Sequence, residues 1–182
     1  YPDHAVLGEE DGLRGGPDAR VRWIVDPIDG THSFARGVPV WATLVACEVD
    51  GTLAVGVASA PALGTRWWAA RGLGAYRAAL PYRGAPLEAE RIHVSTIAAL
   101  ENAQLLYGSY NLTLDAWDGR ADALLRAAWR TRGFSDFWGH ALVAEGSAEA
   151  AAASGAAAAL PIHWGDIQGG FSDALRFRDA LA

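Results

Sequence analysis

The residues most suited to chemistry form the string WIVDPIDGT at positions 23–31. Two carboxylates, Asp26 and Asp29, stand three positions apart, and a glycine and a hydroxyl follow them directly. Two acids on a rigid turn can converge on one hard cation, and the carbonyl of Ile28 can supply a further oxygen ligand. A turn with solvated acids is the alternative for either dipeptide alone. The complete nonamer favours the cation site.

These acids must be held by a strand and the turn that follows it. Val21 to Val25 have the β-branched and aromatic character of a strand. We expect this strand to stop at Asp26-Pro27, because proline lacks a backbone donor and moves its predecessor away from helix.

A second acidic group, Gly8-Glu9-Glu10-Asp11, follows the short apolar run Ala5-Val6-Leu7. Taken alone, three acids after a glycine are more typical of a solvated turn. The functional alternative is a loop that delivers one carboxylate to a metal.

The rest of the chain predicts strands first and helices later. An Asp50-Gly51 pair between two apolar runs is the strongest short hairpin signal. We expect strands at 40–49, 53–60, 65–70, 74–77, 91–95 and 104–107. Helical periodicity predicts helices at 113–130 and 136–145, and the alanine-rich stretch 148–160 has helix propensity but little bulk for packing. A meander followed by helices indicates an α+β layered fold.

Composition limits the classes of protein. In 182 residues, 51% hydrophobic and 20% charged residues indicate a globular chain, and a net charge of −6 argues against a nucleic-acid binder. A negative protein can still bind phosphate esters if divalent metals supply positive charge. No run reads as a membrane span and no signal peptide opens the chain, so we expect a cytoplasmic protein without a membrane partner.

Several motifs together resemble one family. The segment Gly8-Glu9-Glu10, the string at 23–31 and the segment 56–60 resemble the inositol monophosphatase superfamily of Mg-dependent, lithium-sensitive phosphatases. The segment WRTRGFSDFWGHALVAEG at 129–146 resembles more narrowly the actinobacterial-type histidinol-phosphate phosphatases, as does the opening YPDHAVLGEE. The resemblance implies a single domain over 1–182 with a layered αβαβα sandwich, usually a homodimer. It also implies a phosphoric monoester hydrolase of histidine biosynthesis that acts on a small-molecule phosphate ester by two-metal activation of water.

The resemblance assigns roles residue by residue. The Mg²⁺ ligands that it implies are Glu9, Asp26, the Ile28 carbonyl and Asp29. Thr31 resembles the threonine that orients the attacking water, and Glu9 joins it as a catalytic residue.

Substrate contacts are implied as well. Asp29, Gly30 and Thr31 are implied to bind the phosphate group of the substrate. Gly30 and Thr31 would offer it backbone donors. Asp136 lies where this branch places an acid that faces the amine of histidinol.

The chain also departs from the family pattern. An upstream aspartate that pairs with the motif threonine is not present, and aligning Leu160-Pro161-Ile162 puts Gly155 where a metal-binding aspartate belongs. A different alignment offers Asp166 instead. We therefore expect a partial domain that lacks upstream helices and C-terminal elements. An inositol or sugar-phosphate phosphatase, or a non-catalytic remnant that binds metal or phosphate, stays open as an alternative.

Overall fold

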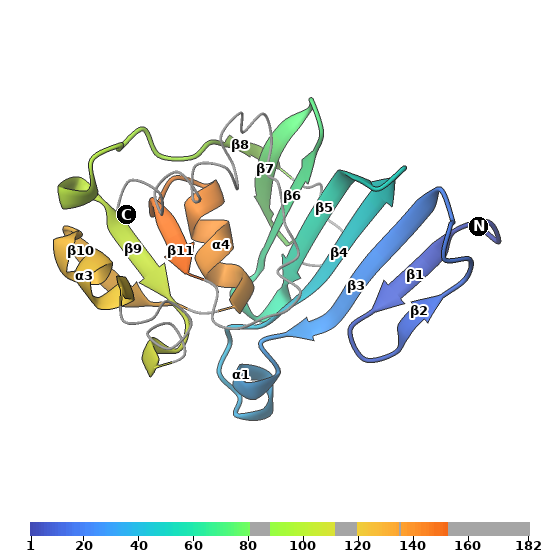
Figure 1. Cartoon of the computed structure of the whole chain (residues 1–182), viewed down its shortest axis with the longest axis horizontal. Coiled ribbons are helices and arrows are strands. Elements are labelled where there is room, and N and C mark those ends of the chain that lie inside the picture. Colours follow the sequence, from blue (N-terminus) through green and yellow to red (C-terminus); the bar gives the residue numbers. More distant parts are fainter. Residues whose placement is uncertain (81–87, 112–119, 135, 153–182) are drawn as a thin grey trace.

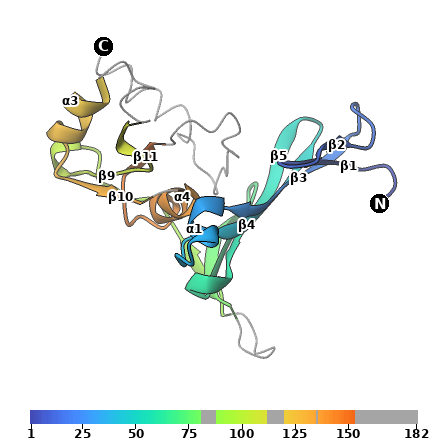
Figure 2. The same ribbon diagram turned by 90° about the horizontal axis from the view of Figure 1, so that it is seen from below.

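The computed structural model describes residues 1–80, 88–111, 120–134 and 136–152. An eight-stranded mixed sheet and a three-stranded parallel sheet lie on either side of the helix α4, residues Asp136–Ala144 (Figures 1 and 2). The large sheet has the order β2-β1-β3-β4-β5-β6-β7-β8. Its strands are β1 Ala5–Gly8, β2 Gly12–Arg14, β3 Val21–Asp29, β4 Ala42–Val49, β5 Thr52–Ala60, β6 Thr65–Ala70, β7 Gly74–Ala79 and β8 Glu90–Ile92.

The small sheet has the order β10-β9-β11, with both neighbours parallel to β9. Its strands are β9 Gln104–Tyr107, β10 Arg130–Gly133 and β11 Ala150–Ala152. The helix α3, Arg120–Ala127, lies beside this sheet, away from α4 (Figure 1). The remaining elements are the short helix α1, Thr31–Ala35, and two 3₁₀ turns, Pro61–Leu63 and Leu100–Asn102. The alternation of sheet and helix layers confirms the predicted layered α+β fold.

The core lies between the large sheet and α4. Alternate residues of the sheet point toward the helix, and Phe137 and Ala141 of α4 are buried among them. Trp67 is 4% exposed in this core, whereas its neighbour Trp68 faces the opposite side and stacks on Tyr76. The prediction that the two tryptophans face opposite sides of the sheet is confirmed.

The prediction that the first long strand stops at Asp26-Pro27 is wrong. β3 continues to Asp29, and its register against β4 shifts between Asp26 and Asp29. Proline is tolerated at such an irregularity because no ladder hydrogen bond is required there. Asp26 and Asp29 therefore lie within the irregular end of β3 and not beyond it.

One other expectation needs correction. Ala150–Ala152 form strand β11 rather than helix, because they pair with β9. The solvated turn expected around Glu9 is present: residues 9–11 form an exposed turn that joins β1 and β2 as a hairpin. The predicted helix at 113–130 is present from Arg120 to Ala127 and ends before Arg130, which begins β10; residues 113–119 lie outside the described residues. Within the described chain, no helix is long and apolar enough to cross a membrane.

Candidate active site

Strand pairing brings the two acidic segments together. β1 runs parallel to β3, with Gly8 opposite Val25, and the Glu9 N–H donates to the Val25 carbonyl at 3.1 Å. Because the carboxyl ends of parallel neighbours meet at one edge, Glu9 follows its strand beside Asp26. The Glu9 carboxyl is close enough to help raise the pKa of Asp26.

Asp29 is held by α4. The Phe137 N–H donates to the Asp29 carboxylate at 2.7 Å, across 108 residues of sequence. The first N–H groups of a helix have no partner within it, so an acid placed there is stabilised. The contact joins the end of β3 to the beginning of α4.

Gly30 makes the turn between β3 and α1. Its φ of 84° lies in the left-handed region, which glycine adopts without steric cost. A Cβ at this position would lie 2.8 Å from the Val40 carbonyl and 3.2 Å from an Asp136 carboxylate oxygen. Gly30 thus permits the close approach of Asp136 to the motif.

The clustered carboxylates raise one another's pKa. Burial, followed by the charges of Glu9 and Asp29, raises the pKa of Asp26 to about 7. Burial is also the largest cause that raises the pKa of Asp29 to about 6, opposed by the Phe137 N–H and assisted by the charges of Asp136 and Glu9. None of the ion pairs in the described part of the chain includes Asp26 or Asp29.

These shifts predict how metal-free stability depends on pH. The folded chain keeps protons on Asp26 and Asp29 that the unfolded chain, with pKa values near 4, has released. Folding stability should therefore fall as pH rises from about 4 to about 7. Thermal unfolding in chelator should show a Tm lower by a few degrees at pH 7.5 than at pH 5. The Asp26→Asn variant should show a smaller decrease in Tm between pH 5 and pH 7.5. An equal decrease in both proteins would contradict the raised pKa of Asp26.

The carboxylates of Glu9, Asp26, Asp29 and Asp136 do not form a complete metal site. Among the residues that the structure describes, no group of three His, Cys, Asp or Glu is arranged to hold a metal ion. Glu9 lies beside Asp26, whereas Asp29 turns toward α4. The donor set nevertheless consists of oxygen atoms, which suits a hard divalent cation, and added positive charge would relieve the repulsion that raises both pKa values.

The remaining expected site residues take different places. Thr31 is exposed at the first position of α1, and Ile28 is half-buried, with its N–H donating to Asp26 at 3.0 Å. Gly155 and Asp166 lie outside the described residues.

Two contacts of the site were missed by sequence reasoning. The Phe137 backbone donor has no side-chain signature, although the predicted start of a helix at 136 offered a partial signal. The Thr43 hydroxyl donates to the Pro27 carbonyl at 2.8 Å and supports the distorted end of β3. A threonine in a strand carries no local sign of such a role.

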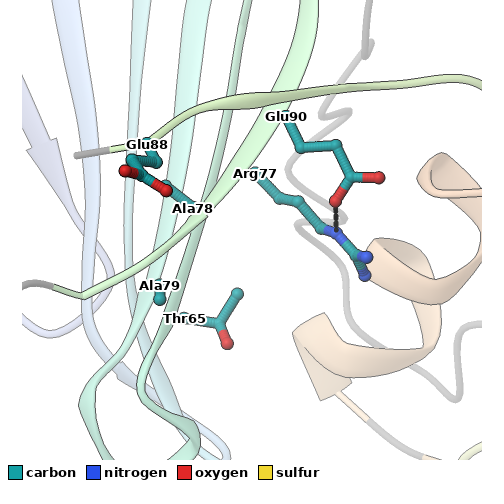
Figure 3. A pocket seen from close by; sticks show the side chains of 6 residues that line it. All are labelled: Thr65, Arg77, Ala78, Ala79, Glu88 and Glu90. Carbon is teal, nitrogen blue, oxygen red and sulfur yellow. Dashed lines mark hydrogen bonds and ion pairs between the residues drawn. The ribbon is translucent and has the colours of Figure 1, made fainter.

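A separate pocket lies away from these acids, at β6 and β7 (Figure 3). It is lined by Thr65, Arg77, Ala78, Ala79, Glu88 and Glu90. Its one cation, Arg77, is occupied by ion pairs with Glu90 and Glu145 at 2.9 Å each. The cluster of acids at the end of β3 is therefore the better candidate for chemistry.

Comparisons with known proteins identify the family of the chain. The chain matches the model of the inositol monophosphatase family over residues 1–164. It is 45% identical over 159 residues to a histidinol-phosphatase of Streptomyces coelicolor, covering 81% of this chain and 55% of that protein. It is 46% identical over 156 residues to a histidinol-phosphatase of Mycobacterium tuberculosis, covering 83% of this chain and 56% of that protein.

The fold is also that of solved relatives. The structure of the extragenic suppressor protein suhB from Bartonella henselae matches with a TM-score of 0.68 and 28% identity, over 81% of this chain and 54% of that chain. The chain thus spans about half the length of the curated relatives that it matches. With the family model matched over most of its residues, the chain belongs to the inositol monophosphatase family.

Proposed function

We propose that the protein is a Mg-dependent phosphomonoester hydrolase whose preferred substrate is histidinol phosphate. The observation that carries the proposal is the gathering of Glu9, Asp26, Asp29 and Asp136 where the end of β3 meets the β1–β2 connection and the start of α4. A phosphate ester cannot approach so many carboxylates without positive charge between them. A divalent cation at this junction would supply that charge.

The ligands proposed for Mg²⁺ are Glu9, Asp26, the Ile28 carbonyl and Asp29. When bound, the metal supplies a water of lowered pKa and neutralises charge on the phosphoryl oxygens. Phosphoryl transfer needs positioning and charge neutralisation more than covalent chemistry. The chain accordingly needs no nucleophilic side chain.

The protein's own groups would position the reactants. Thr31 is exposed two positions after Asp29, the last acid of the motif, so its hydroxyl can orient water there. The backbone donors of Gly30 and Thr31 are proposed to contact the phosphate. Glu9 would accept a hydrogen bond from the same water.

Asp136 is proposed to recognise the alcohol part of the substrate. Its carboxylate lies against Gly30 and raises the pKa of Asp29, so it borders the proposed phosphate site. An acid there suits the cationic amine of histidinol, and the two curated relatives described above are histidinol-phosphatases. The cytoplasmic location and the homodimer expected from the sequence belong to the same proposal.

The test of substrate is phosphate release from histidinol phosphate with Mg²⁺, compared with inositol monophosphate. Histidinol phosphate should give the larger kcat/KM, and lithium should inhibit the reaction. A larger kcat/KM for inositol monophosphate would overturn the substrate assignment. Absence of Mg-dependent release from either ester would favour a non-catalytic remnant.

Asp136→Asn gives a sharper test of amine recognition. Asp136 has a φ of 56°, and asparagine also tolerates this left-handed conformation. Losing one charge-assisted hydrogen bond of about 1.5–3 kcal/mol should lower kcat/KM for histidinol phosphate about 10- to 100-fold. Inositol monophosphate, which carries no amine, should lose much less. Equal losses for both esters would exclude Asp136 as the amine contact.

A further inference from the structure

The C-terminal end of α4 is tied to the large sheet by a buried carboxylate. The side chain of Glu145, which directly follows α4, is 9% exposed. It accepts a hydrogen bond from the Trp67 indole N–H at 3.1 Å and forms an ion pair with Arg77 at 2.9 Å. Figure 3 shows Arg77 on β7, within reach of Glu90, with the α4 ribbon beside its guanidinium.

The N-terminal end of the same helix holds the candidate site. Phe137 donates its N–H to Asp29 at 2.7 Å, and its ring lies 6.0 Å from the Trp67 ring. Trp67 therefore contacts both the residue that holds Asp29 and the carboxylate that anchors the helix. An α-helix is stiff over this length, about 12 Å from 137 to 145, so anchoring one end restrains the position of the other.

Close packing leaves the helix end little freedom. Gly146 has a φ of 77°, and a Cβ there would lie 2.8 Å from the His93 carbonyl. Two contacts of directed geometry, from Trp67 and Arg77, then set how far α4 can slide along the sheet. Apolar contacts alone are not directional and define such a position less strictly.

We propose that Glu145 is a positioning residue: by holding the end of α4 on Trp67 and Arg77, it keeps the Phe137 N–H on the Asp29 carboxylate. The inference deepens the proposed function, because it concerns the placement of one proposed metal ligand. The contacts on which it rests exist independently of any metal or substrate.

Hydrogen exchange at the Phe137 amide tests the proposal directly. This N–H stands in the first turn of α4, where no intrahelical acceptor exists, so its protection reports the bond to Asp29. In Glu145→Gln, exchange at Phe137 should accelerate about 10-fold more than exchange at amides of β4 and β5. Mg²⁺ affinity should fall by about the same factor.

Glu90→Gln is the matched control. Glu90 pairs with the same arginine at the same distance, but its side chain is 65% exposed and bonds to no residue of α4 in the described chain. This variant should leave Phe137 exchange within about 2-fold of the parent. Trp67→Phe keeps an aromatic ring and removes only the indole donor, and it should reproduce part of the Glu145→Gln effect.

Two results would overturn the inference. Glu145→Gln could accelerate Phe137 and the strand amides equally, which would mean that Glu145 contributes only global stability. Glu90→Gln could also match Glu145→Gln at Phe137. Failure of the parent to hydrolyse any ester would reject the proposed function but leave the exchange result intact, so the two failures are distinguishable.

Discussion

Replacing Asp26 by asparagine is expected to remove Mg-dependent hydrolysis and, at the same time, to stabilise the metal-free protein at pH 8. The first effect follows because Asp26 is a proposed metal ligand beside Glu9, and metal catalysis supplies several kcal/mol. A fall in kcat/KM of about 1,000-fold or more is expected. The second effect follows because a neutral amide relieves the repulsion that raises the pKa of Asp26 to about 7. Asparagine Oδ1 can still accept the Ile28 N–H.

The opposite signs of these effects make the prediction specific. Phosphate release and the thermal unfolding of the protein in chelator measure them. Asp11→Asn is the control, because Asp11 lies in the β1–β2 connection that carries Glu9 and pairs only with the exposed Arg14 among the described ion pairs. It should change neither quantity much. A metal-free Asp26→Asn protein that is less stable than the parent would argue for a purely structural Asp26.

Gly30→Ala is expected to destabilise the fold by about 2–4 kcal/mol and to eliminate Mg²⁺ binding. A left-handed backbone costs a non-glycine residue about 1–2 kcal/mol, and the new Cβ would lie 2.8 Å from the Val40 backbone oxygen. Relief of that clash must move the turn that carries Asp29. Urea unfolding measures the loss through the midpoint at constant m-value.

Gly37→Ala separates backbone strain from the clash. Gly37 has a φ of 71°, and a Cβ added to it would meet nothing within 4 Å, so the same substitution there adds only strain. We expect a loss of about 1–2 kcal/mol and unchanged Mg²⁺ affinity. If Gly30→Ala and Gly37→Ala lost similar amounts of stability and of Mg²⁺ affinity, the turn at Gly30 would be shown to tolerate the added methyl.

Local patterns predicted the meander well. The Asp50-Gly51 turn adopts φ values of 52° and 70°, as a tight hairpin requires. Strand Thr65–Ala70 and helix Asp136–Ala144 match their predicted bounds to within one residue. In these segments, apolar alternation and turn chemistry agree with the packing of the complete fold.

The failures arose where tertiary contacts override local preference. Ala150–Ala152 form a strand despite the helix propensity of alanine, because their backbone pairs with β9. Their small size also suits the position: a Cβ on Gly139 of α4 would lie 3.5 Å from the Ala151 Cβ. Proline at 27 did not end β3, because the register shift removes the need for its missing donor.

The predictions about the candidate site also divide into those that local sequence supports and those that depend on tertiary contacts. The grouping of Asp26 with Asp29 was predictable from their spacing, whereas Glu9 was assigned to the site only by the family resemblance. The support of these acids was not predictable, because the Phe137 N–H and the Glu145 anchor depend on long-range contacts. Sequence thus indicated which groups could act, and the fold showed how they are held.

Calorimetric titration of the protein with Mg²⁺ at pH 8, beside Asp26→Asn, tests the central claim most directly. We predict saturable binding of Mg²⁺ to the parent and loss of that binding in the variant. Absence of saturable binding to the parent, or equal affinity in Asp26→Asn, would contradict a magnesium site built on Glu9, Asp26 and Asp29.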